Sequence, residues 1–124
     1  MKAVLQNFDL IAEVRAHHDE RSMARLGRRL MKLGEEYGES LQAYLALTGP
    51  SNYKKITPAD LREELIDVCL VAMDALLHRV PGEERLTDVE LNEVLIAEFK
   101  RKIKKWKKVT ALVAPKKKVK SARA

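Results

Sequence analysis

The chain has 124 residues, of which 46% are apolar, 34% charged and only 5% aromatic, so one small domain with an aliphatic core is expected. The formal net charge is +6, but from Lys100 onward the chain has basic residues and no acidic ones, and the part before Lys100 is acidic overall. No run of about 18 apolar residues and no signal peptide is recognisable, which excludes a membrane-spanning protein and predicts no membrane partner and a cytoplasmic location.

The spacing of apolar residues predicts four helices. The first covers about residues 4–17. The second covers about residues 22–47, with Ser22 as a suitable N-cap and Thr48-Gly-Pro as a stop signal. Gly34 and Gly38 lie four residues apart within it, a spacing that predicts the close approach of another helix.

The third helix is predicted to begin with Thr57 as N-cap and Pro58 at its first helical position, and to run to about Arg79. Asp60 lies in its first turn, where a negative charge suits the helix dipole. Apolar residues cover most of the circumference of this helix, so we expect it to be buried on several sides, in part by a partner subunit. Cys69, the only cysteine, is therefore expected to be a buried and inert thiol.

The fourth helix is predicted to begin near Thr87-Asp88, with Glu90 as the acid of a capping box, and to extend to about Val113. Residues 114–124 are rich in lysine and have no apolar periodicity, which predicts a disordered basic tail. We therefore interpret the chain as an all-α protein: a four-helix bundle-like unit over residues 1–113 that associates into a dimer or tetramer, followed by the tail.

Two acidic pairs occur on the second and third helices. Glu36 and Glu39 lie three residues apart, as do Glu64 and Asp67, so the members of each pair point to the same side of their helix. Few basic residues are near enough along the chain to offset the repulsion within the pairs. Two antiparallel helices of a bundle can bring such pairs together, and carboxylate oxygens are the ligands of a hard cation such as Mg²⁺.

Asp67 gives the strongest argument for a metal site. It lies between Ile66 and Val68 in a stretch that predicts burial, and burying an unpaired carboxylate is costly. Asp74 follows on the same side of the helix. The alternative, a solvated acidic face, is retained for the neighbouring acids Glu35 and Glu63.

The order of the acids resembles that of the MazG-like nucleotide pyrophosphatases. Lys32-Leu-Gly-Glu-Glu-Tyr-Gly-Glu, a loop and then Leu61-Arg-Glu-Glu-Leu-Ile-Asp-Val are similar to the family pattern Glu-Glu-x-x-Glu, spacer, Glu-x-x-Asp. The resemblance covers about residues 22–108. It implies the all-helical fold of dimeric dUTPases and phosphoribosyl-ATP pyrophosphatases. It also implies hydrolysis of a nucleoside triphosphate between its α- and β-phosphates, with Mg²⁺, or Mn²⁺ in its place, as the cofactor.

The same resemblance implies roles for single residues. The Mg²⁺ ligands would be Glu36, Glu39, Glu64 and Asp67. Either Glu35 or Glu63 would position or deprotonate the attacking water. Phosphates would be bound by Lys102 and Lys105, with Lys54 from the loop, although the stretch from Lys100 to Trp106 lacks the Asn that the family commonly has there.

Two other interpretations remain open. The first is a helical nucleic-acid-binding or regulatory protein, because Lys116-Lys-Lys-Val-Lys in the basic tail could bind phosphate backbones. The same tail could instead serve only to keep the protein in solution. The second is a family member that has lost activity and acts as a scaffold, but the presence of an acid at all four ligand positions argues against it.

Overall fold

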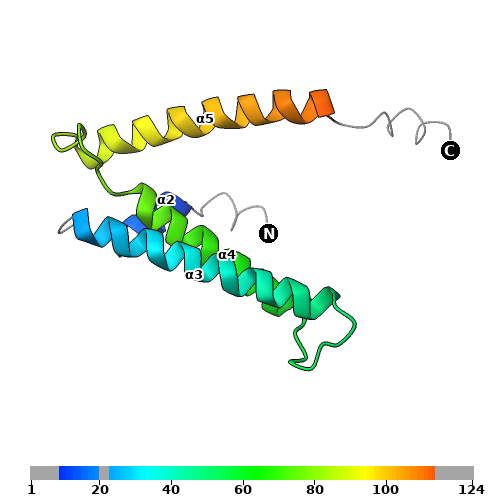
Figure 1. The fold of residues 1–124 in the computed structure, drawn as a ribbon. Helices are drawn as coiled ribbons and strands as arrows, with labels where there is room; N and C mark the ends of the chain where they lie inside the picture. Colours follow the sequence, from blue (N-terminus) through cyan, green and yellow to red (C-terminus); the bar gives the residue numbers. More distant parts are fainter. Residues whose placement is uncertain (1–8, 20–22, 114–124) are drawn as a thin grey trace. The chain divides into compact units, whose positions relative to one another are not determined.

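The computed structural model describes residues 9–19 and 23–113 of the chain. Within these ranges the protein is all-helical, with four helices and no strand, as predicted (Figure 1). The chain divides into two units, Met1–Glu84 and Arg85–Ala124, and each is described by itself. None of the helices in the described ranges is long and apolar enough to cross a lipid bilayer.

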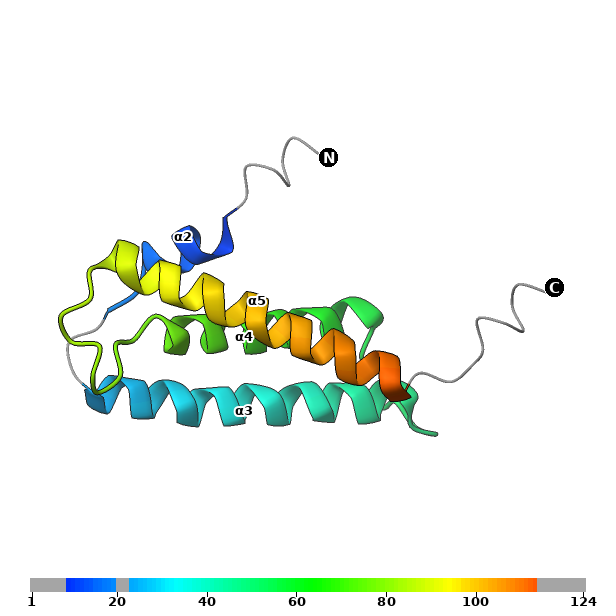
Figure 2. The ribbon, with the colours of Figure 1, turned by 90° about the horizontal axis from the view of Figure 1, so that it is seen from above.

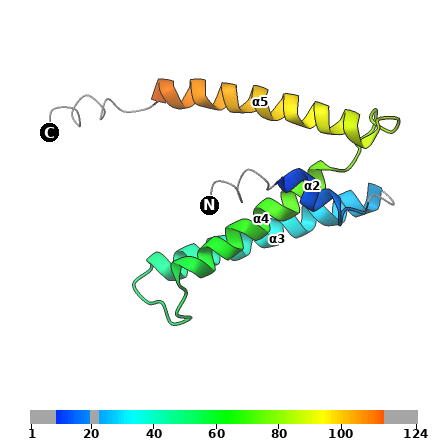
Figure 3. The same ribbon diagram turned by 180° about the vertical axis from the view of Figure 1, so that it is seen from behind.

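The first unit is built on an antiparallel pair of helices. The helices α3 (Met23–Thr48) and α4 (Pro58–Leu76) lie side by side and are joined by the loop of residues 49–57 (Figures 1 and 2). The short helix α2 (Leu10–Arg15) packs against α4 (Figure 3). In the second unit, the single helix α5 covers Asp88–Val113.

The predicted helix starts at Thr57 and Thr87 are confirmed by complete capping boxes. The Thr57 hydroxyl accepts a hydrogen bond from the Asp60 backbone N–H at 3.2 Å, and the Asp60 carboxylate accepts one from the Thr57 N–H at 2.8 Å. Thr87 and Glu90 make the same two bonds at the start of α5, at 3.1 and 3.0 Å. These backbone hydrogen bonds lower the pKa values of the Asp60 and Glu90 carboxyls.

Other predicted helix ends shift by a few residues or lie outside the described ranges. Helix α4 ends at Leu76 instead of Arg79. Beyond this end the His78 N–H donates a hydrogen bond to the Ala75 carbonyl, three residues back, instead of the α-helical bond between residues four apart. The first described helix begins at Leu10, where the Asp9 side chain caps it. The predicted helix at residues 4–8, the N-cap at Ser22 and the tail over residues 114–124 fall outside the described ranges.

Within the single chain the third helix is not buried on several sides, and its burial by a partner subunit stays a prediction. Helix α4 has no buried residue, and Leu65, Ile66 and Leu70 are all exposed. Cys69, predicted to be buried, is also exposed. In the first unit α2 and α3 pack against α4, and two neighbours cannot enclose a helix that is apolar nearly all round.

Candidate metal centre

Three carboxylates from two helices converge in the first unit. Glu36 on α3 and Glu64 and Asp67 on α4 each offer one oxygen, and these oxygens lie within 4.8 Å of one another. The pairing of α3 with α4 brings the two acidic motifs together. Around Mg²⁺, with oxygens at about 2.0–2.1 Å, opposite ligands are about 4.2 Å apart, so small side-chain movements would let the trio hold one ion.

The trio also contains carboxylate oxygens whose hydrogen-bonding capacity is unused. Glu36 is only 7% exposed. Its Oε2, and that of Glu64, are buried and accept no hydrogen bond from any residue that the structure describes. Buried carboxylate oxygens are normally hydrogen-bonded or bound to a cation, because leaving them without a partner is costly. The donor set, three carboxylates, therefore fits a hard divalent ion.

The electrostatics around Glu64 point the same way. Burial raises the pKa of the Glu64 carboxyl, and the charges of Glu39, Asp67 and Glu36 raise it further. Glu39 contributes in addition through a hydrogen bond to Glu64. The other three acids of the predicted ligand set thus all raise the pKa of Glu64, and Glu36, Glu64 and Asp67 form the tight trio.

Lys32 lies next to the trio and was not among the predicted site residues, because we expected few ion pairs to offset the repulsion between the acids. The Nζ of Lys32 lies 3.0 Å from Glu36 Oε1 and 3.4 Å from Glu35 Oε1. The hydrogen bond to Glu36 is the main reason that the pKa of Lys32 is raised. The spacings of three and four residues along the helix are the sequence signal that predicts these pairs.

The structure reverses the expected burial within the trio. Asp67 is exposed, as is its neighbour Ile66, so the argument for a metal from the burial of Asp67 is wrong. Glu36, for which no burial was predicted, is the most buried of the three. The reason is that Glu36 lies on α3 facing α4, whereas α4 has uncovered faces.

The remaining predicted site residues belong to both units. Lys54, from the loop, lines a cavity of about 140 Å³ together with Glu39 and Glu64. Glu35 and Glu63 are exposed, one residue before Glu36 and Glu64 respectively. Lys102 and Lys105 are exposed on α5, in the second unit.

Asp74 does not join the trio, although it follows Asp67 on the same helix. Its Oδ1 accepts a hydrogen bond from His18 Nδ1 at 2.8 Å. Its Oδ2 lies 3.6 Å from Arg25 Nη2 and 3.8 Å from Arg29 Nε. His18 follows α2 and the two arginines lie on α3, so a second charged cluster exists at the end of α4.

The sequence has no match among protein families or curated proteins, and the structure has none among solved structures. The resemblance to the MazG-like pyrophosphatases therefore remains a hypothesis that rests on the acidic motifs.

Proposed function

We propose that the chain is a Mg²⁺-dependent nucleoside triphosphate pyrophosphohydrolase. It would cleave a ribo- or deoxyribonucleoside triphosphate between the α- and β-phosphates to give the monophosphate and pyrophosphate. The observation that carries the proposal is the convergence of Glu36, Glu64 and Asp67, with unpartnered carboxylate oxygens, on one small volume. The resemblance of the acidic motifs supplies the class of reaction.

Each acid near the trio has a role in this proposal. Glu36, Glu64 and Asp67 would hold the ion, with Glu39 beside Glu64 as a fourth ligand. When bound, Mg²⁺ would neutralise part of the triphosphate charge and lower the pKa of a bound water. Glu35 and Glu63 adjoin the trio in sequence, and a carboxylate there that does not bind the ion can orient or deprotonate the attacking water.

The phosphates themselves need cationic partners from the chain. Lys54 lines the cavity that Glu39 and Glu64 share, which puts an ammonium group beside the acids. Lys32 lies one turn before Glu36 on α3, and its ammonium group neutralises the Glu36 carboxylate. Lys102 and Lys105 on α5 are the further phosphate-binding residues that we propose.

The proposal is tested by pyrophosphate release from canonical and damaged nucleotides in the presence of Mg²⁺ or Mn²⁺. Glu64→Gln should lower turnover by about a hundredfold or more, because it removes a ligand charge and keeps the side-chain volume. Glu93→Gln, an exposed acid on α5, is the matched control and should keep full turnover. Absence of pyrophosphate release from every nucleotide with either metal would refute the enzyme proposal.

We further propose that the chain forms a dimer or tetramer. Leu65, Ile66 and Leu70 remain exposed on α4, and a large exposed apolar surface usually marks an interaction site. Apart from the adjoining backbone of α3 itself, no described residue lies within 4 Å of a Cβ built at Gly34 or Gly38, so none of the described residues makes the predicted close approach. A helix of a second copy packed over these positions would account for both observations.

Nucleic-acid binding is a second candidate, favoured by the basic side of α5. All basic residues from Lys100 to Lys108 are exposed, and that stretch contains no acid. Phosphate backbones bind such surfaces without sequence preference and with strong salt dependence. Deleting residues 115–124 should leave pyrophosphate release intact, and salt-sensitive binding of single- or double-stranded DNA or RNA would support the second function.

A further inference from the structure

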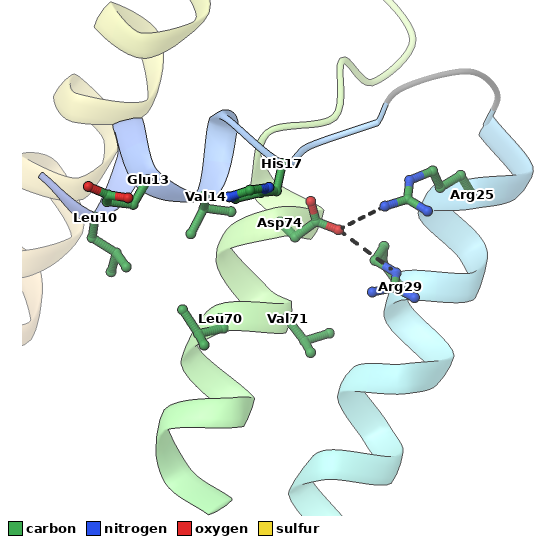
Figure 4. Close-up of a pocket in the computed structure, with 9 residues that line it drawn as sticks. All are labelled: Leu10, Glu13, Val14, His17, Arg25, Arg29, Leu70, Val71 and Asp74. Carbon is green, nitrogen blue, oxygen red and sulfur yellow. Dashed lines mark ion pairs between the residues drawn. The ribbon is translucent and has the colours of Figure 1, made fainter. Parts of the chain in front are cut away.

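One cavity of the first unit lies away from the acidic trio and is lined by residues of α2, α3 and α4. It has a volume of about 520 Å³, within the range of about 300–1,000 Å³ typical of small-molecule pockets. Apolar side chains from two helices form much of its wall: Leu10, Val14, Leu70 and Val71 (Figure 4). A cavity with such walls can take the apolar body of a ligand.

One end of this cavity carries more positive than negative charge. Arg25 and Arg29, one turn apart on α3, both point toward Asp74 (Figure 4). Their separations from Asp74 Oδ2, 3.6 and 3.8 Å, are longer than hydrogen bonds. The Nε atoms of both arginines are buried and donate no hydrogen bond to any described residue. Among the described residues, the two guanidinium groups therefore share one carboxylate and keep unused donors.

The opposite end of the cavity has a different character. Glu13 and Leu10 on α2 line it, on the far side of Asp74 from the two arginines in Figure 4. A carboxylate there repels a second anionic group on the same ligand. The cavity is therefore suited to a molecule with one anionic end and an uncharged remainder.

From this arrangement we propose a binding site for an amphiphilic anion, a carboxylate or phosphate attached to an apolar group. Its anionic oxygens accept hydrogen bonds from Arg25 and Arg29, which suit carboxylate and phosphate oxygens equally well. Its apolar part packs on Leu70 and Val71. This site uses no residue of the acidic trio and needs no metal, so it stands or falls independently of the proposed hydrolase activity.

The experiment titrates the full chain, in buffer with EDTA, with octanoate and with octyl phosphate below their micelle concentrations. Isothermal titration calorimetry should give saturable binding of one or both, and the comparison between them identifies the preferred anion. Inorganic phosphate and 1-octanol each carry only half of the proposed chemistry, so each should bind at least about tenfold more weakly than the preferred amphiphile.

Three variants locate the site. Arg25→Gln/Arg29→Gln should weaken binding by about tenfold or more, because it removes the charged donors. Val14→Phe should weaken it by filling the cavity while leaving every charge in place. Arg28→Gln is the matched control, an exposed arginine on the same helix that does not line the cavity, and it should bind as the unmodified chain does. No saturable binding of either amphiphile, or equal binding by all variants, would overturn the proposal.

Discussion

Among single residues, Glu64 links the acidic trio to the pH dependence of stability. Its pKa in the folded protein is raised above the ordinary value of 4.5, mainly by burial and then by Glu39, Asp67 and Glu36. A carboxyl with a raised pKa holds its proton more tightly in the folded than in the unfolded state. Its effect on the free energy of unfolding therefore changes as pH rises from 4.5 into the raised range.

We predict that, without divalent metal, the contribution of Glu64 makes the free energy of unfolding fall as pH rises through this window. Glu64→Gln should remove that part of the decline and make the metal-free protein more stable at neutral pH. Urea unfolding in EDTA at several pH values between 4 and 8 measures both effects. Adding Mg²⁺ should stabilise the unmodified chain increasingly with pH, because only deprotonated carboxylates bind the ion. An identical pH dependence in the variant would show that Glu64 is not the group responsible.

Asp74 is the second residue with a decisive environment. It is largely buried, with a 14% exposed side chain, and it accepts a hydrogen bond from His18, whose side chain is 5% exposed. Nearby, the Nδ1 of the buried His78 donates a hydrogen bond to the Asp74 backbone carbonyl at 3.0 Å. The His78 ring packs edge-on against the His18 ring, with the two ring centroids 4.4 Å apart. Asp74 therefore ties the α2–α3 segment to the end of α4.

Asp74→Asn should destabilise the protein by about 2 kcal/mol, less than a fully buried ion pair would cost, because Arg25 and Arg29 are partly exposed. The substitution leaves both guanidinium groups without a counter-charge from Asp74. Chemical denaturation of the full chain measures the loss, with the exposed acid Glu93→Gln as a control for a simple change of net charge. A change below about 0.5 kcal/mol, typical of surface substitutions, would contradict the assigned role.

At the scale of helices, capping determines where α4 and α5 begin. Thr57 and Thr87 each satisfy a backbone N–H of the first turn that has no partner within the helix, and the acid three residues later reciprocates. These bonds join neighbours in the chain, so the motif works without any tertiary contact. That is why the starts of α4 and α5 could be predicted within one residue.

Thr57→Ala should therefore cost about 1 kcal/mol of stability, since it removes the hydroxyl that caps α4. Thr110→Ala is a suitable comparison, because the Thr110 hydroxyl donates to the Trp106 carbonyl within α5 and caps no helix start. That second change should be close to neutral. Thermal unfolding followed by circular dichroism measures both, and equal effects of the two substitutions would speak against the cap.

At the scale of the whole molecule, the exposed apolar surface of α3 and α4 is unfavourable in water. Tyr37, Leu41 and Leu45 on α3 are all exposed, in addition to the apolar residues of α4. Each Å² of apolar surface removed from water contributes about 25 cal/mol of stabilising free energy, so the driving force for self-association grows with the area that the contact buries. The proposed dimer or tetramer is the assembly that would cover it.

Leu41→Lys should weaken self-association by at least about tenfold, because burying a lysine ammonium without a partner is unfavourable. Sedimentation velocity over a range of protein concentrations measures the change. Ala97→Lys adds the same charge at an exposed position of α5 and should leave the association unchanged. An unmodified chain that stays monomeric at all accessible concentrations would contradict the oligomer itself.

The sequence by itself determined the local structure: the all-helical class, the helix starts with their caps and the two acidic motifs on α3 and α4. Helical spacing and capping act over three or four residues, so these features can be identified without knowing the fold. The expectation that the motifs meet also held for Glu36, Glu64 and Asp67, because a short loop between two long helices favours antiparallel pairing.

Only the tertiary structure decided which faces of the helices are covered. In the folded chain Glu36 is buried, whereas Asp67 and Cys69 are exposed. Asp74 pairs with His18, Arg25 and Arg29 instead of joining the trio. Periodicity shows which residues share a side of a helix, but the burial of that side depends on what packs against it. The physical reason is that burial and long-range ion pairs are properties of contacts between elements, which a single helix cannot specify.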